Sequence, residues 1–313
     1  MAKRQSTTWA SRHRQWLRTV HAIVKAMEGG RRIPLGPSRF PLLRPKRRRG
    51  AGEPVKVVIC APHPDDECLI GGLPLRLSLE TGARVTNCAI TLGSNRRRRA
   101  GRLRELESAC QVLGFELVVP EPVSGFEDVN LATRTKRPGE WRAKVETLAK
   151  AFDRLRPDAV FAPHAEDWNS THIGTHHLVV DALGAHLERS GRGALPLILT
   201  EFWHELAQPN LMIGLTPEIV AIELMATAEH GGEVRRNPYH LRQPSRLMNN
   251  VRRGSEVVGG QGGPAQRFAF AELYRCVFMR GPELLEPLPG GLTIGPKEKL
   301  DLGGLSGRFR KDS

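Results

Sequence analysis

The sequence predicts an α/β fold with an open, mostly parallel sheet and helices on both faces. From residue 54 onward, short β-branched or apolar runs alternate with longer segments of helical periodicity. This alternation is typical of parallel strands joined by right-handed helical crossovers. A length of 313 residues allows one large α/β domain with appendages. The longest apolar runs are too short to cross a bilayer, so we expect no membrane-spanning segment.

The N-terminal segment differs from the rest of the chain. Residues 8–28 place Trp9, Trp16, Val20 and Met27 at helical spacing, with Arg and Lys on the other face, and Gly29-Gly30 ends the pattern. Residues 31–53 are rich in Pro, Gly and Arg, which is typical of a linker. The helix is expected either to pack on the body or to contact an anionic lipid surface or a polyanionic partner.

The positive charge is concentrated in this segment. Of the net charge of +14, residues 1–50 carry +13, from 14 Lys and Arg residues and the single acid Glu28. The remainder is almost neutral, so no specific nucleic-acid partner is expected. The five cysteines form no CxxC pair, and no secretory signal precedes them. We therefore expect free thiols in a cytoplasmic protein, with peripheral attachment to a membrane as the alternative that the basic arm leaves open.

The main domain begins with the β-branched strand Val55–Ala61, and further strands are expected at 84–92, 115–119, 157–163 and 196–201. Helices are expected at 68–80, 100–113 (closed by Gly114), about 140–155, 172–189 and 217–230. Residues 231–267 look rich in loops, and 268–279 fit a late strand or helix. These patterns divide the chain into a basic helix and linker at 1–53, a main domain at 54–282 and a C-terminal tail at 283–313.

A first polar cluster follows the first expected strand, in the sequence Pro62-His63-Pro64-Asp65-Asp66-Glu67. His63 and Asp66 are three residues apart on a tight turn and can face one point, while Asp65 stays free. Neutral nitrogen and anionic oxygen donors that converge in this way form zinc sites. The alternative is that the acids only stabilise the start of a helix through its dipole.

A second cluster follows the strand at 157–163. Residues 164–177 contain four of the 11 histidines, together with Glu166 and Asp167. His172 and His176 are four residues apart and share one face of a helix. Because ligands of open α/β sheets bind outside the carboxyl ends of the strands, we expect the two clusters to converge.

These motifs resemble those of a known family. The sequence HPDDE after a hydrophobic strand, with an acid–x4–His segment entering a later helix, is similar to the LmbE/PIG-L family of metal-dependent N-deacetylases, which are N-acetylglucosaminyl deacetylase-like enzymes. Thr91-Leu92-Gly93, Arg102–Leu106 and Leu113-Gly114 match the second strand and helix of the family pattern. The resemblance covers residues 54–205 and implies a Rossmann-like, LmbE-like fold.

The resemblance also implies roles for individual residues. His63, Asp66 and His172 match the ligands of a Zn²⁺ ion or another divalent metal, and Asp65 matches the general base. Asn169 replaces a histidine that stabilises the oxyanion, and an amide N–H also donates to an oxyanion. The implied reaction removes an N-acyl group, acetyl above all, from an amino sugar conjugate. Substrate contacts are expected from Arg102, with Arg104 as a fallback, and from loop aromatic residues: Trp168, Trp141, Trp203 and Tyr239.

Other interpretations remain open. Asn169 also fits a catalytically inactive or carbohydrate-binding relative that keeps the metal site. The basic arm also fits a protein associated with anionic membranes. A dinucleotide-binding domain is not expected, because no GxGxxG follows the strand at 55–60.

Overall fold

The computed structural model describes residues 8–37, 53–121 and 124–309. Its centre is a nine-stranded sheet with the order β3-β2-β1-β4-β5-β7-β6-β9, and β8 pairs with β7. The five strands from β3 to β5 are parallel, whereas β7 runs antiparallel to β5 and β6. The α/β fold with a mostly parallel sheet is therefore confirmed. The strands are β1 (Lys56–Ala61), β2 (Arg84–Ala89), β3 (Glu116–Val118), β4 (Ala159–Pro163), β5 (Leu195–Thr200), β6 (Leu211–Leu215), β7 (Phe270–Arg280), β8 (Glu283–Leu285) and β9 (Leu292–Ile294).

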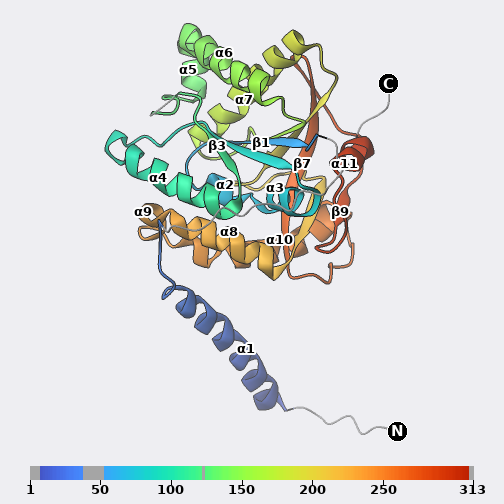
Figure 1. Cartoon of the computed structure of the whole chain (residues 1–313). Coiled ribbons are helices and arrows are strands. Elements are labelled where there is room, and N and C mark those ends of the chain that lie inside the picture. Colours follow the sequence, from blue (N-terminus) through green and yellow to red (C-terminus); the bar gives the residue numbers. More distant parts are fainter. Residues whose placement is uncertain (1–7, 38–52, 122–123, 310–313) are drawn as a thin grey trace.

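Helices cover both faces of the sheet (Figure 1). Strand β1 shows why: Val57 and Ile59 belong to the hydrophobic cluster on the α4 and α8 face, whereas Val58 and Cys60 belong to the cluster on the α6 and α7 face. This period of two is the pattern of a strand buried on both sides. The helices are α1 (Trp9–Gly30), α2 (Asp66–Leu69), α3 (Gly72–Arg76), the π-helical η1 (Leu77–Thr81), α4 (Arg96–Leu113), α5 (Leu131–Lys136), α6 (Pro138–Leu155), α7 (Ser170–Ser190), α8 (Pro217–Glu229), α9 (Gly231–Val234), the 3₁₀ turn η2 (Tyr239–Leu241), α10 (Gln243–Val257) and α11 (Leu302–Phe309).

The strand order reverses at β1. It pairs in parallel with β2 on one side and with β4 on the other, and the chain moves outward in both directions from there. The loops that leave β1 and β4 at their carboxyl ends therefore open a crevice at a topological switch point. Both polar clusters of the sequence begin on these two loops and continue into the helices that follow them, α2 and α7.

The structure corrects several expected elements. The helix expected at 68–80 is divided into α2, α3 and η1, and residues 231–267 contain the 15-residue helix α10. Helix α10 is rich in Arg and Asn and buries Leu247 and Val251 against the sheet, so its apolar stripe is short. Strand β6 was not predicted, because its five residues include Gly214. In the segment expected to be a tail, β8 and β9 pair with β7 and β6, so the sheet continues past residue 282.

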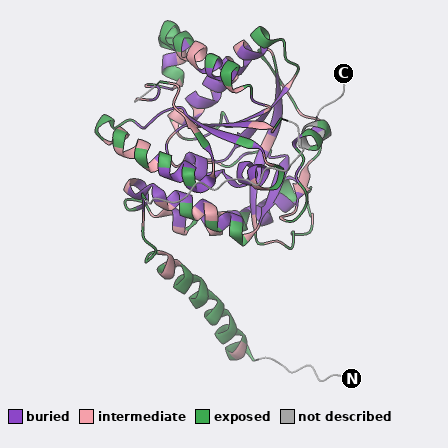
Figure 2. Cartoon of the chain, viewed as in Figure 1, coloured by how far each residue is buried: buried purple, intermediate pink, exposed green. Residues whose placement is uncertain are grey.

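Helix α1 projects away from the body (Figure 1). None of its residues is buried, and Figure 2 shows it exposed along nearly its whole length. The expectation that this helix packs on the body is therefore wrong. Most of the linker expected at 31–53 lies outside the described residues. Among the described helices, none is both long and apolar enough to cross a membrane. All five cysteines are buried and unpaired, as expected of free thiols.

Candidate metal centre

Three donor atoms meet where the β1 and β4 loops converge. His63 leaves the end of β1, Asp66 opens α2 and His172 is the third residue of α7. Nδ1 of His63 lies 3.2 Å from Nε2 of His172 and 3.4 Å from Oδ2 of Asp66, and the remaining separation, between His172 and Asp66, is 3.3 Å. Donors bound to one tetrahedral zinc ion at about 2.1 Å lie about 3.4 Å apart. The three atoms thus have the spacing of one metal site.

The charges around these donors also favour a cation. The two histidines lower the pKa of Asp66 against the raising effect of its burial. Burial acts to lower the pKa of His172, but the carboxylates of Asp66 and Asp167 outweigh it and raise the pKa to about 10. A positive charge at this point is therefore strongly stabilised. The side chain of His63 is 20% exposed whereas that of His172 is fully buried, so the site opens on the His63 side.

Asp167 orients the buried imidazole. Its Oδ2 lies 3.5 Å from Nδ1 of His172, on the side of the ring that faces away from the other donors. The backbone N–H groups of Asn169 and Trp203 donate to the two Asp167 oxygens at 2.8 and 3.3 Å and fix the carboxylate. A carboxylate behind a metal-binding histidine sets the tautomer and raises the basicity of the ring. The acid of the acid–x4–His motif has this position, although no role for it was expected from the sequence.

We expect Asp167→Asn to weaken metal binding about 10- to 100-fold, because the variant loses the charge that orients His172. The affinity is measured by competition with a chromophoric chelator. The matched control is Glu166→Gln, which removes the exposed neighbouring acid and should leave the affinity unchanged. Equal affinities for the two variants would exclude this role for Asp167.

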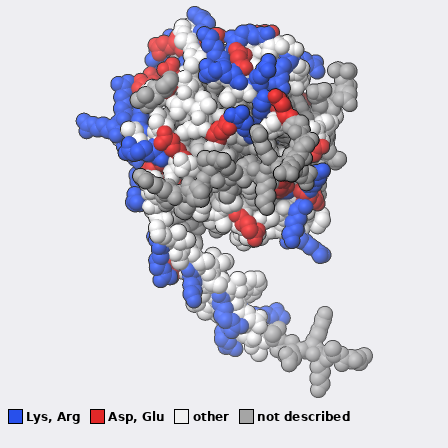
Figure 3. All heavy atoms as spheres, in the orientation of Figure 1, with Lys and Arg blue, Asp and Glu red and all other residues white. Residues whose placement is uncertain are grey.

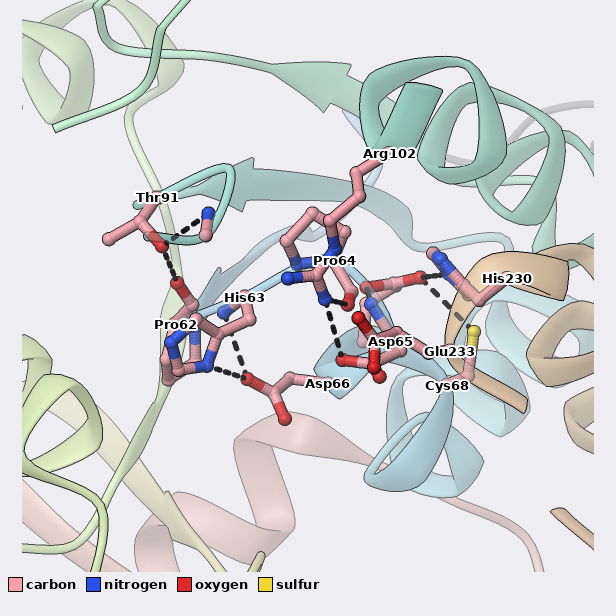
Figure 4. A network of polar contacts seen from close by, with 12 residues as sticks. Pro62, His63, Pro64, Asp65, Asp66, Cys68, Thr91, Arg102, His230 and Glu233 are labelled. Carbon is pink, nitrogen blue, oxygen red and sulfur yellow. Dashed lines mark hydrogen bonds and ion pairs between the residues drawn. The ribbon is translucent and has the colours of Figure 1, made fainter. Parts of the chain in front are cut away.

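Asp65 lies beside His63 and Asp66 (Figure 4) and is not one of the three donors. Its φ of 106° lies in the left-handed region, which is costly for any residue except glycine. Oδ2 accepts a hydrogen bond from the Tyr239 hydroxyl at 2.5 Å, and Oδ1 lies 3.7 Å from Nη2 of Arg102. Burial, reinforced by the neighbouring charge of Asp66, raises the pKa of Asp65 to about 7. A carboxyl group with this pKa can both take up and release a proton near neutral pH.

Glu67, the third acid of the motif, anchors the loop from behind. Oε1 lies 2.7 Å from Nε2 of His230 and accepts from the Cys68 thiol, while Oε2 accepts from the backbone N–H of Asp65 at 3.0 Å. Both Glu67 and His230 are fully buried. Burial acts to lower the pKa of His230, but the charge of Glu67 outweighs it and raises the pKa. This pair is therefore a buried ion pair that holds the backbone of the strained residue in place.

Arg102 reaches from α4 to the same loop (Figure 4). Its Nη2 donates to the carbonyl oxygen of Pro64 at 2.7 Å. The guanidinium also lines the cleft above the three donors. The expected contact with substrate stays a prediction, and the observed role of Arg102 is to fasten the motif loop to α4.

The cleft over the donors has a volume of about 260 Å³. Asn169 lines it and caps α7, with Oδ1 accepting from the N–H of Thr171 at 2.8 Å. The cap occupies the amide oxygen and leaves the NH₂ group of Asn169 as the donor. Trp203 lines the cleft, whereas Trp168 does not: its side chain is 77% exposed and packs on His204. The expected substrate contact by Trp168 thus has no support from the position of its ring.

Several other candidates have structural contacts. His164 hydrogen-bonds the carbonyl of His204, His176 hydrogen-bonds that of Pro163, and the Trp141 indole donates to Asp181. None of the three lines the cleft, so neither histidine compensates for Asn169.

The far wall of the cleft is cationic. Arg98 and Arg236 both pair with Glu233, at 2.8 and 2.5 Å, and all three line the cleft. The two guanidinium groups share one carboxylate, so the wall carries a net positive charge near its mouth. A polar or anionic group fits this wall better than an apolar one.

Comparison with known proteins bears on this site. Residues 58–183 match the family model described as PIG-L, GlcNAc-PI de-N-acetylase, and this range contains all three donors and Asp65. Solved structures that share the fold include deacetylases. Over residues 58–183, the chain is thus similar to the PIG-L family of de-N-acetylases. Tyr239, His230 and Glu233 lie beyond residue 183, outside the family match, so only the fold brings them to the site. No curated protein matches the chain.

Several solved structures share the fold of this chain. The conserved protein TT1542 from Thermus thermophilus is 21% identical, with a TM-score of 0.53 over 71% of this chain and 94% of its own. N,N′-diacetylchitobiose deacetylase from Pyrococcus horikoshii is 18% identical, with a TM-score of 0.50 over 72% and 84%. The hydratase GalB from Pseudomonas putida KT2440 is 17% identical, with a TM-score of 0.50 over 73% and 98%. Because a hydratase has the same fold, the reaction must be argued from the site.

Proposed function

We propose that this chain is a zinc-dependent hydrolase that removes an N-acyl group, acetyl above all, from an amino sugar conjugate. One observation carries the proposal. The three donor atoms have tetrahedral spacing, and the carboxylate of Asp65, which is not one of the donors, lies beside them. A metal site that combines three protein ligands with an open side is typical of catalytic zinc. The match of residues 58–183 to a de-N-acetylase family model supports an amide as the bond that is cleaved.

The residues of the chain divide the chemistry between them. A divalent ion held by His63, Asp66 and His172 would polarise the amide carbonyl and lower the pKa of water. Asp65 takes the proton from the attacking water as the new C–O bond forms. The NH₂ group of Asn169 donates to the oxyanion of the tetrahedral intermediate. Asp65 then returns its proton to the amine nitrogen as the C–N bond breaks, which yields a carboxylic acid and a free amine.

The substrate is argued from the cleft. The cleft is small and polar. His63 and Asp66 line it from the metal site, and Arg98, Glu233 and Arg236 form its wall. Trp203, which is 50% exposed, offers an aromatic surface at its edge. The structures with a similar fold include a deacetylase of N,N′-diacetylchitobiose and a deacetylase of the teicoplanin biosynthetic pathway, and the first supports a sugar as the group that bears the amide.

The test combines metal analysis with product detection. We expect about one zinc ion per chain, and acetate release from N-acetylglucosamine conjugates that stops on chelation and returns with zinc. The panel should contain neutral and phosphate-bearing conjugates, because the wall is cationic. Since the same ligands also accept iron or cobalt, each metal is added back separately. A metal-loaded protein that releases no acetate from any member would refute the proposal.

A second candidate is a metal-binding relative without hydrolase activity. Asn169 favours it, because an amide cannot supply a proton as the histidine of the family pattern can. Such a protein would bind one ion and bind N-acetyl sugars without turnover. Calorimetric titration of the metal-loaded protein with the same panel separates the two, because binding without acetate release supports only the second.

A further inference from the structure

Helix α1 presents an apolar surface that nothing in the described chain covers. At 3.6 residues per turn, Trp9, Trp16, Val20 and Ile23 fall within an arc of about 60° on one side of the helix. Their exposed fractions are 78%, 69%, 52% and 54%. Exposed aromatic and branched side chains in one row are unusual on a monomer and mark an interaction site. We call these four residues the α1 face.

The α1 face continues onto the body. A groove of about 1070 Å³ lies between the C-terminal half of α1 and the helices α8 and α10. Ile23 and Met27 line it from α1, and Met225 and Met248 line it from the body. The two body methionines are 40% and 53% exposed. The apolar surface is therefore longer than the helix alone and includes the part of the body where α1 is attached.

The opposite side of α1 is basic. Arg14, Arg18 and Lys25 project there, and Figure 3 shows Lys and Arg side chains along the helix. The only acid in the first 50 residues is Glu28, against 14 Lys and Arg residues. The rest of the chain has a net charge of +1, so the body carries no net negative charge that would compensate the positive charge of residues 1–50. Whatever covers the α1 face must accept this concentrated positive charge.

We propose that α1 is an interfacial anchor that binds the surface of an anionic lipid bilayer, with the α1 face among the acyl chains. A helix with tryptophan and branched aliphatic residues on one side and Arg and Lys on the other is built for this position. Indole rings are stable at the boundary between headgroups and acyl chains. Basic side chains add attraction to anionic headgroups. A second copy of the chain is disfavoured as the occupant, since pairing two such segments would bring like charges together.

The root of α1 fixes which part of the body the membrane would approach. The N–H of Gly36 donates to the carbonyl of Ala228 at 3.0 Å, at the end of α8. The next helix, α9, carries Glu233, which lines the cleft. The part of the body to which α1 is attached, at the end of α8, is thus next to the helix that forms one wall of the cleft. The proposal concerns α1 and does not depend on the proposed reaction.

The test is sedimentation of the full chain with vesicles. Vesicles of phosphatidylcholine with about one phosphatidylglycerol in three are compared with pure phosphatidylcholine. We expect binding to the anionic vesicles only. The double variant Trp16→Ser with Ile23→Ser should weaken it at least tenfold at unchanged charge. The matched control is Val257→Ser with Leu284→Ser, which removes two other exposed apolar side chains and should bind as the unmodified chain does.

A second pair of variants separates charge from apolar contact. Arg14→Glu with Arg18→Glu should also weaken binding at least tenfold, whereas Arg142→Glu with Arg154→Glu, on the exposed side of α6, should have little effect. Light scattering of the same samples reports the oligomeric state. Equal binding to both kinds of vesicle, binding that survives Trp16→Ser with Ile23→Ser, or a dimer that this variant dissociates in place of vesicle binding would each overturn the proposal.

Discussion

Replacing His172 with alanine should remove the metal and abolish the activity. His172 supplies one of only three protein donors among the described residues of the site, and its ring is fully buried between the carboxylates of Asp66 and Asp167. Mutation of a residue that orients a metal ligand weakens metal binding about 10- to 100-fold. Loss of the ligand His172 itself should therefore weaken metal binding by more than about 100-fold. Elemental analysis after dialysis, and titration with zinc, measure the effect.

The control for this prediction is on the same helix. His176 lies one turn further along α7, is also buried, and contacts the carbonyl of Pro163 in place of the metal donors. Burial lowers the pKa of His176 to about 4, so this ring is neutral and carries no charge into the site. His176→Ala should keep one ion per chain, although thermal unfolding should show a loss of stability from the cavity. If His172→Ala keeps its ion with unchanged affinity, the three donors do not form the site.

The parallel part of the fold was predictable because its signals are local. The β-branched run from 56 to 61, the glycine that ends α4 and the alternation of strands with helices all follow from short-range sequence patterns. Helix α10 and strand β6 were not predictable, because the contacts that stabilise them are not local in sequence. Helix α10 is stabilised by packing of a few apolar side chains on β7, and β6 by pairing with β7 and β9, contacts that lie far apart in sequence.

The site shows the same division. The sequence predicted that the two motifs converge, because the carboxyl ends of β1 and β4 meet at the switch point. The choice of His63, Asp66 and His172 as ligands followed from the resemblance to the family, and the structure brings these three residues together. Tyr239 was expected only as a substrate contact, and its hydrogen bond to Asp65 and the pairing of His230 with Glu67 were not predicted, because both residues reach the motif from the irregular chain after α8. Asp65, by contrast, was singled out from the sequence, because it lies between the expected ligands His63 and Asp66 and is not needed to bind the metal. The role of Asp65 as the general base stays a prediction, which a substitution at this residue tests.

Replacing Asp65 with asparagine should leave the metal in place and reduce kcat/KM about 100- to 10,000-fold, the usual contribution of a general base. Asparagine suits the test because it keeps the shape of the side chain and tolerates a positive φ better than most residues. It also keeps an oxygen to accept the Tyr239 hydroxyl. Metal content and acetate release are measured on the same preparation, so loss of catalysis is separated from loss of the ion.

Tyr239→Phe is the matched variant for Asp65→Asn. It removes the hydroxyl that donates to Asp65 at 2.5 Å and leaves the carboxylate itself. Because the base survives, the loss should be about tenfold or less, the value of one hydrogen bond, and should appear in kcat with KM unchanged. At equal metal content, Asp65→Asn should therefore reduce kcat/KM much more than Tyr239→Phe does. An Asp65→Asn protein that releases acetate at a rate near that of Tyr239→Phe would mean that another group takes the proton from water.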